Sequence, residues 1–159
     1  SWAWGQNGIR TTPVTMARVI SIVANQGEMP ITRFVMDSDK KDSDKEIDIV
    51  SSAQAAMLEQ FLKFTAQEHD KFTKSTLGGK TGTPERVWVD IHGYRHIIND
   101  GWYICFIEDA HVTSAKGVKQ HPIAIAVRIE RINDGMSGKA VSMTKEVVLP
   151  ILATLGYTH

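Results

Sequence analysis

The sequence predicts an α+β domain in which helices pack on an antiparallel sheet of about three strands. Two segments near the N-terminus have helical periodicity, whereas the chain after residue 78 changes to strand-like patterns and closes on a further helical segment. With 159 residues, 42% of them hydrophobic, and no internal repeat or interdomain linker, the chain is expected to belong to one domain.

Residues 11–27 predict a helix with both ends marked. Thr12 is an N-cap residue, and Pro13 suits the first helical turn, where a missing N–H costs nothing. Gly27 is expected to supply the left-handed residue that ends the helix. The apolar positions at helical spacing, expected to be buried, are Met16, Val19, Ile20, Val23 and Ala24.

Residues 51–70 predict a second helix, which starts at a serine N-cap. Residues 37–46, between the two helices, are a dense run of mixed charge and predict a solvated loop or hairpin tip. The apolar positions of the second helix, expected to face the core, are Met57, Leu58, Phe61 and Leu62.

The segments after residue 78 predict the sheet. Residues 86–91 alternate apolar and other side chains, and residues 92–100 are expected to form a hairpin turn and its return arm. Residues 101–109 are a short apolar and aromatic run typical of a buried strand, and residues 122–132 are the longest strand candidate.

Residues 139–157 predict the closing helix, which follows a glycine-rich break at residues 133–138. Pro150 is expected to kink this helix because proline lacks the N–H that the helical ladder needs. The apolar positions in register are Val141, Val148, Leu152 and Leu155.

Charge and cysteine content exclude several classes of protein. The sequence has 18 basic and 18 acidic residues, so no long-range field steers it to nucleic acid or an anionic membrane. Cys105 is the only cysteine, which excludes an intrachain disulfide; we expect it to be inert in the core.

His92 and His96 have the spacing of two metal ligands on a helix, but the strand pattern and the missing third ligand disfavour a metal site. No cofactor or metal is therefore expected.

Residues 76–89 contain two overlapping short motifs. Gly79, Lys80 and Thr81 match the end of a nucleotide-binding P-loop. Lys74 stands where that motif requires its first glycine, and a strand pattern follows where the motif requires a helix. The P-loop interpretation is therefore disfavoured.

Read as a strand beside a cleft, Lys80-Thr81-Gly82-Thr83 forms an anion-binding ledge. The ammonium of Lys80 attracts a carboxylate, and the hydroxyls of Thr81 and Thr83 donate hydrogen bonds. Gly82 lets a ligand approach the backbone closely, and the backbone N–H of Thr83 is a candidate donor to a developing oxyanion. Taken alone, these residues also fit an ordinary glycine-rich turn that enters a strand.

The order of features along the chain resembles the C-terminal half of the transpeptidase domain of high-molecular-weight penicillin-binding proteins. A Gly-Gln segment with a Thr-Pro-started helix comes first, then a second helix, the Lys-Thr-Gly-Thr strand, two further strands, a glycine-rich break and a closing helix. These features lie at residues 5–35, 49–64, 78–86, 101–109, 121–130, 133–138 and 139–157. The ordered context makes the short Lys-Thr-Gly-Thr motif specific.

The resemblance implies a serine-type D-Ala-D-Ala transpeptidase of bacterial cell-wall synthesis. Such an enzyme acylates its serine with the D-Ala-D-Ala end of a peptidoglycan stem peptide and passes the acyl group to an amine; β-lactam antibiotics trap the acyl-enzyme. By this resemblance Lys80 gives electrostatic support, Thr81, Gly82 and Thr83 bind substrate, and the Thr83 N–H is an oxyanion donor. The resemblance also implies a periplasmic or extracytoplasmic location, with an anchor upstream of Ser1.

Two of the three motifs of the family are absent or misplaced. Ser-x-Asn does not occur, and Ser-x-x-Lys occurs only at Ser38–Lys41, in the charged loop, and at Ser142–Lys145, in the closing helix. Neither is in the place of a nucleophile, so residues 1–159 are expected to be the C-terminal portion of one transpeptidase domain and to be inactive alone. Its expected partners are the missing N-terminal half and, through an exposed apolar surface and sheet edge, a second copy.

Two other functions remain open. A non-catalytic binding or scaffold module on the penicillin-binding fold would lack Ser-x-x-Lys and Ser-x-Asn upstream of Ser1 as well. A β-lactamase or β-lactam sensor shares Lys-Thr-Gly, although residues 5–19 fit the high-molecular-weight transpeptidases better. Trp2, Trp4 and Trp88 have no assigned role, because packing, anchoring and cleft lining are all compatible with their positions.

Overall fold

A computed structural model of the chain describes residues 10–32, 47–73, 75–109, 111–114, 117–120, 122–132, 138–155 and 157–158. The elements along these residues are, in order, α1 (Pro13–Ala24), β1 (Glu28–Met29), β2 (Ile47–Asp48), α2 (Ser52–Glu68), β3 (Leu77–Gly82), β4 (Glu85–Val89), β5 (Arg95–Ile107), β6 (His111–Ser114), β7 (Gly117–Gln120), β8 (Ile123–Ile132), α3 (Gly138–Met143), the π-helical turn η2 (Thr144–Val148), α4 (Leu149–Thr154) and β9 (Tyr157–Thr158).

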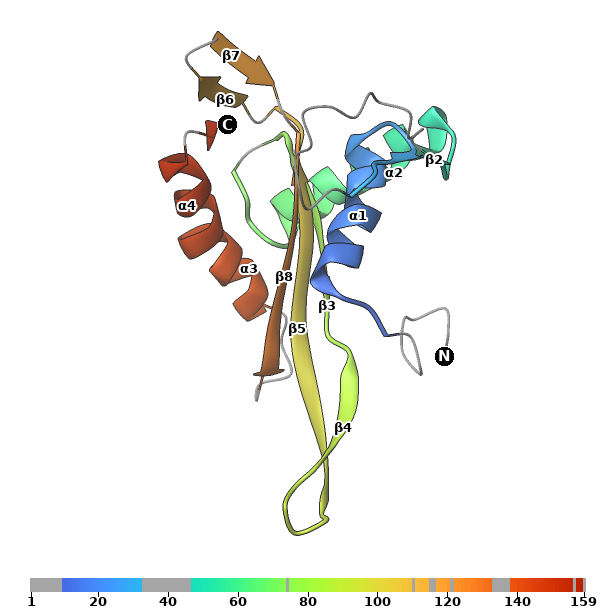
Figure 1. Cartoon of the computed structure of the whole chain (residues 1–159), viewed down its shortest axis with the longest axis vertical. Helices are drawn as coiled ribbons and strands as arrows, with labels where there is room; N and C mark the ends of the chain where they lie inside the picture. Colours follow the sequence, from blue (N-terminus) through green and yellow to red (C-terminus); the bar gives the residue numbers. More distant parts are fainter. Residues whose placement is uncertain are drawn as a thin grey trace, which may run out of the picture.

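The central sheet is antiparallel and is built around β5. Strand β8 pairs with one side of β5, whereas β3 and β4 pair with the other side, one after the other along its length. Helices α1 and α2 cover one face of this sheet, and α3, η2 and α4 cover the opposite face, whose core Ala66 of α2 also joins (Figure 1). The predicted α+β class is therefore confirmed. Strands β1 and β2 form a separate pair, and β7, β6 and β9 form a small sheet.

Strand β5 is longer than its sequence pattern predicts. A return arm at residues 92–100 and a separate strand at 101–109 are expected, but the structure has one strand, Arg95–Ile107, across both. The strand continues because β4 pairs with its first half and β3 with its second half. As a result, the β4–β5 hairpin extends away from the helices (Figure 1).

Apolar side chains form a separate core on each face of the sheet. On the α3 side, Tyr103 and Cys105 of β5 pack with Leu77 of β3. The Cys105 thiol is fully buried, as expected of an inert core cysteine, and burial together with nearby Asp70 raises its pKa to about 12. On the side of α1 and α2, the buried residues are Ile20, Val23 and Phe106, with Ala24, Leu62, Ile104 and Ala124 packed against them.

Helix α1 begins as predicted but ends differently. The hydroxyl of Thr12 accepts a hydrogen bond from the Thr15 N–H at 3.1 Å, which confirms the N-cap. At the other end, Gln26 takes the left-handed position with φ of 54°, and Gly27 follows with φ of 109°, so the prediction that Gly27 itself ends the helix is wrong. Gly27 is needed for a second reason, since a Cβ there would overlap the carbonyl oxygen of Val50.

The buried face of α1 is shifted around the helix from the predicted face. Ile20 and Val23 are buried, but Val19 is 41% exposed and Ile22 is buried instead. Helix α1 contacts β5, β8 and α2, so its buried face is set by neighbours on two sides. Met16 is half-buried and borders a cleft beside the start of α1.

Helix α2 turns a different side toward the sheet than its sequence predicts. It packs through the buried residues Ala55 and Ala66, whose small side chains allow a close approach to β3. The helix is apolar on more than one side, so periodicity alone does not identify the buried one. Three predicted core positions are exposed and these predictions are wrong: Met57 is 61%, Leu58 is 44% and Phe61 is 64% exposed.

The closing helix changes its pitch next to its proline. The π-helical turn η2 comes directly before α4, in which Pro150 is the second residue. Because Pro150 donates no hydrogen bond, the expected distortion takes the form of a wider helical turn. Val141 is buried and Val148 packs against the core, whereas Leu155 is 63% exposed, contrary to prediction.

Among the residues that the structure describes, none of the helices combines the length and apolarity needed to cross a membrane.

Replacing Gly79 with alanine is expected to destabilise the protein by about 1–3 kcal/mol, the usual cost of overpacking a core. A Cβ at Gly79 would lie 2.6 Å from Cζ of Tyr103, whose ring is buried and stacked on Phe72. Gly82→Ala on the same strand is the matched control, because its Cβ would meet Trp102 at an ordinary 3.6 Å. Chemical denaturation compares the two, and equal free energies of unfolding would contradict the prediction.

Candidate active site

A cleft of about 770 Å³ lies between the start of α1 and the central sheet. Residues of α1, β3, β4, β5 and β8 line it. Strand β3 contributes Lys80, Thr81 and Gly82, and Thr83 follows in the connection to β4. The structure therefore brings all four predicted ledge residues to one cleft.

Strand β3 presents this ledge because only its first half is packed away. Residues 77–79 are buried, and the lack of a side chain at Gly78 and Gly79 lets the strand lie against Phe106 and Tyr103. The rest of the strand is accessible, with Lys80 exposed. The glycines thus fix the strand against the core, and the residues that follow them border solvent.

The Lys80 ammonium lies along the ledge. Its Nζ donates to the backbone oxygen of Thr81 at 3.1 Å and to Thr81 Oγ1 at 3.3 Å. Both hydrogen bonds are exposed, so a bound carboxylate can take their place with a charge-assisted interaction. A cation, threonine hydroxyls and an open approach at Gly82 make this part of the cleft suited to a carboxylate ligand.

The same cleft holds a second set of charged residues, which are not among the site residues predicted from the sequence. The Asp100 carboxylate of β5 accepts from Arg86 Nε of β4 at 3.1 and 3.2 Å and from Arg128 Nη2 of β8 at 2.7 Å. All three residues line the cleft. Glu130 forms further ion pairs with Arg128 at 3.1 Å and with Arg86 at 3.6 Å.

Asp100 remains ionised although it is buried. Burial alone raises the pKa of a carboxyl group, but hydrogen bonds from Arg128, the Arg131 N–H and Arg86 outweigh burial and hold the pKa of Asp100 below its ordinary value. The one sequence signal for this cluster is Arg128, a charge inside the otherwise apolar start of residues 122–132. That signal does not reveal a partner, because Asp100 is 28 residues away in the chain.

The two Ser-x-x-Lys matches of the sequence do not enter this cleft. Ser142 is exposed on α3, the helix that packs on the opposite face of the sheet. Lys145 donates instead to the backbone oxygens of Asp70 and Lys71, and its Nζ lies 4.7 Å from the ring centre of Phe72. The Ser38–Lys41 pair lies outside the described residues.

The two histidines considered as metal ligands lie on the β4–β5 hairpin rather than on a helix. His96 contacts the Asp90 carboxylate at 2.9 Å and is tilted against the ring of Trp88, while His92 is exposed. The guanidinium of Arg131 lies over the Trp88 ring, 4.7 Å from its centre. Trp88 therefore packs between Arg131 and His96. Trp2 and Trp4 lie outside the described residues. Within the described part of the chain, no group of three or more His, Cys, Asp or Glu side chains is placed to hold a metal ion.

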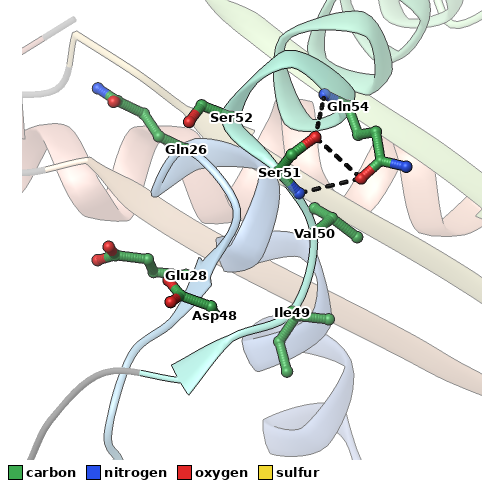
Figure 2. A pocket seen from close by; sticks show the side chains of 8 residues that line it. All are labelled: Gln26, Glu28, Asp48, Ile49, Val50, Ser51, Ser52 and Gln54. Carbon is green, nitrogen blue, oxygen red and sulfur yellow. Dashed lines mark hydrogen bonds between the residues drawn. The ribbon is translucent and has the colours of Figure 1, made fainter.

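A second hollow of about 430 Å³ lies where β1 and β2 meet the start of α2. Figure 2 shows that polar side chains such as Glu28 and Asp48 border it. The dashed lines mark the capping box of α2, in which Ser51 and Gln54 satisfy each other's backbone N–H groups (Figure 2). Ser51 and Gln54 at this hollow thus serve the start of α2, and the Lys-Thr-Gly-Thr residues lie in the larger cleft.

The fold and the larger cleft define a class of protein. Lys-Thr-Gly is a motif of serine acyl-enzymes that react with β-lactams, and here it lies on a cleft-bordering strand of an antiparallel sheet with helices on both faces. The chain matches the penicillin-binding protein transpeptidase domain over residues 1–134. It therefore belongs to this family, which the order of its features indicated. No curated protein matches the chain.

Proposed function

We propose that the protein is a serine-type D-Ala-D-Ala transpeptidase of peptidoglycan synthesis and that this chain forms one wall of its active site. The observation that carries the proposal is the gathering of Lys80, Thr81, Gly82 and Thr83 in one cleft of a transpeptidase-family chain. The proposed donor substrate is a stem peptide that ends in D-Ala-D-Ala, and β-lactam antibiotics are the corresponding inhibitors.

Lys80, Thr81 and Thr83 each have a role in this reaction. The terminal carboxylate of the donor peptide binds to the Lys80 ammonium and to the hydroxyls of Thr81 and Thr83. A serine oxygen attacks the carbonyl carbon of the penultimate D-Ala, and the Thr83 N–H donates to the oxyanion that forms. The bond to the last D-Ala then breaks, and that residue leaves as the free amino acid with a proton on its nitrogen. An amine of a second stem peptide finally takes the acyl group and releases the serine.

The nucleophilic serine is proposed to come from a part of the protein that precedes residue 1. The exposed side of α2 supports this, because Met57, Phe61 and Phe64 are each at least 60% exposed and form an apolar surface. The preceding part of the domain would cover such a surface, and in its absence two copies of this chain would associate. The proposed place of action is the extracytoplasmic side of the bacterial inner membrane, with the anchor outside this chain.

The test is intact-mass analysis after incubation with excess penicillin, applied to this chain and to a longer protein that includes the preceding sequence. We expect no added mass on the chain alone and one stable adduct per molecule of the longer protein. An adduct on the chain would overturn the proposed origin of the serine, and peptide mapping would identify the residue. No adduct on the longer protein would favour a non-catalytic scaffold, whereas an adduct that hydrolyses rapidly would favour a β-lactamase.

A further inference from the structure

The connection between β3 and β4 is held in place from β5. Thr83 and Pro84 form this connection, between Gly82, which pairs with Trp102, and Glu85, which pairs with Asn99. Pro84 has no N–H to donate, but its carbonyl oxygen accepts from the Asp100 N–H at 3.1 Å. The backbone of Asp100 therefore ties the residue after Thr83 to the central strand.

The opposite side of Asp100 faces a β-bulge in β8. One residue of β5, Asp100, separates the pairs Asn99–Ile132 and Gly101–Ile129, whereas β8 has two residues in the same interval. Arg131, one of these two, has φ of 58°, and its N–H donates to Asp100 Oδ1 at 3.1 Å. The Asp100 carboxylate thus accepts a hydrogen bond from the Arg131 N–H, which the bulge leaves without a partner in the strand ladder.

The same carboxylate holds one guanidinium from each neighbouring strand. Arg86 is three residues beyond Thr83 on β4, and Arg128 reaches in from β8. The Asp100 residue is only 3% exposed, so its charge is desolvated and its hydrogen bonds are strong and directional. Without that charge, the guanidinium groups of Arg86 and Arg128 would share the cleft with Lys80, and the carboxylate still paired with both of them among the described residues would be that of the exposed Glu130.

We propose that Asp100 is a positioning residue for acylation, which holds the Thr83–Pro84 connection so that the Thr83 N–H points at the developing oxyanion. This inference rests on the proposed function. Asp100 touches no reacting atom. Its backbone N–H holds Pro84, and its carboxylate fixes β4 and β8 on either side of that contact through Arg86 and Arg128. Its importance follows from geometry, because a misplacement of about 1 Å at a reacting centre can reduce the rate about 10²-fold.

The test measures penicillin acylation of the longer protein under single-turnover conditions, with the noncovalent Kd and the acylation rate constant determined separately. Asp100→Asn keeps the shape of the side chain and removes its charge. We expect the acylation rate constant to fall about 10–100-fold, while Kd stays close to that of the wild type. A merely structural role would lower the thermal stability and leave the acylation rate constant of the folded fraction unchanged.

Lys63→Met is the matched control. It removes ion pairs of Lys63 with Glu59 and Glu108, both at 2.6 Å, at a place that does not border the cleft. We expect this variant to acylate at the wild-type rate, even where its melting temperature falls.

A second variant covers the case in which Asp100→Asn does not fold. Arg86→Gln removes one guanidinium and leaves Asp100 paired with Arg128 and the Arg131 N–H; a smaller loss of acylation rate is expected. If the wild type acylates and the folded variants acylate equally fast, the inference is wrong and the proposed function stands. If the wild type does not acylate, the proposed function itself fails, and the inference fails with it.

Discussion

Replacing Lys80 with alanine is expected to reduce the rate of penicillin acylation of the longer protein about 10²–10³-fold, the loss typical of removing a preorganised electrostatic group. Lys80 is the exposed cation of β3 in the cleft, and its Nζ already lies 3.1 Å from a backbone oxygen of the ledge. Alanine would leave the carboxylate of the proposed substrate with the threonine hydroxyls alone. Stopped-flow measurement of acylation, at several penicillin concentrations, gives the loss in the second-order rate constant.

Two further variants show whether the loss at Lys80 reflects its charge. Lys80→Arg keeps a cation at the ledge and should lose less activity than alanine, although the larger planar group does not reproduce the ammonium. Lys139→Ala removes a lysine from α3, on the opposite face of the sheet, and should acylate as the wild type does. Wild-type acylation by Lys80→Ala would exclude Lys80 from the active site.

Replacing Phe106 with alanine is expected to lower the free energy of unfolding by about 3–5 kcal/mol, the usual range for a buried phenylalanine. The ring is fully buried and packs with Ile20 and Val23 of α1. It also fills the space above Gly78, where a Cβ would lie 2.5 Å from the Phe106 Cζ. Gly78 has no side chain that could move into the resulting cavity. The loss in free energy of unfolding is therefore expected near the upper end of the range.

The control for Phe106 lies on the same strand. Ile97 is 74% exposed on the β4–β5 hairpin, so Ile97→Ala should change the free energy of unfolding by no more than about 0.5 kcal/mol. Urea denaturation of both variants of the protein measures the difference. A Phe106→Ala variant as stable as Ile97→Ala would show that the core on the side of α1 and α2 is not packed as described.

Features that depend on a few adjacent residues could be predicted from the sequence. Thr12 and Ser51 cap their helices as predicted, because a capping side chain reaches only the N–H groups of the next turn. The residues of the Lys80–Thr83 ledge were predicted in the same way, from four consecutive residues and the order of the segments around them, and the structure places all four at one cleft.

The charged cluster at Asp100 could not be predicted, because its members come from three strands. Arg86, Asp100 and Arg128 are brought together by the register of β4 and β8 on β5, and by a bulge that the sequence does not mark. A single aspartate before a glycine reads as a turn residue, and in the structure it lies inside the longest strand of the sheet.

The sequence by itself determined the α+β class, the starts of both long helices, the residues that make up the ledge and the family. Only the tertiary structure decided that Met57 and Phe61 face outward, that β5 continues through residue 101, and that the Asp100 N–H donates to the carbonyl oxygen of Pro84 directly after the ledge. The physical reason is the range of the interactions. Helix capping and strand alternation depend on residues close together in the sequence. Burial and ion pairing depend on which distant elements come into contact.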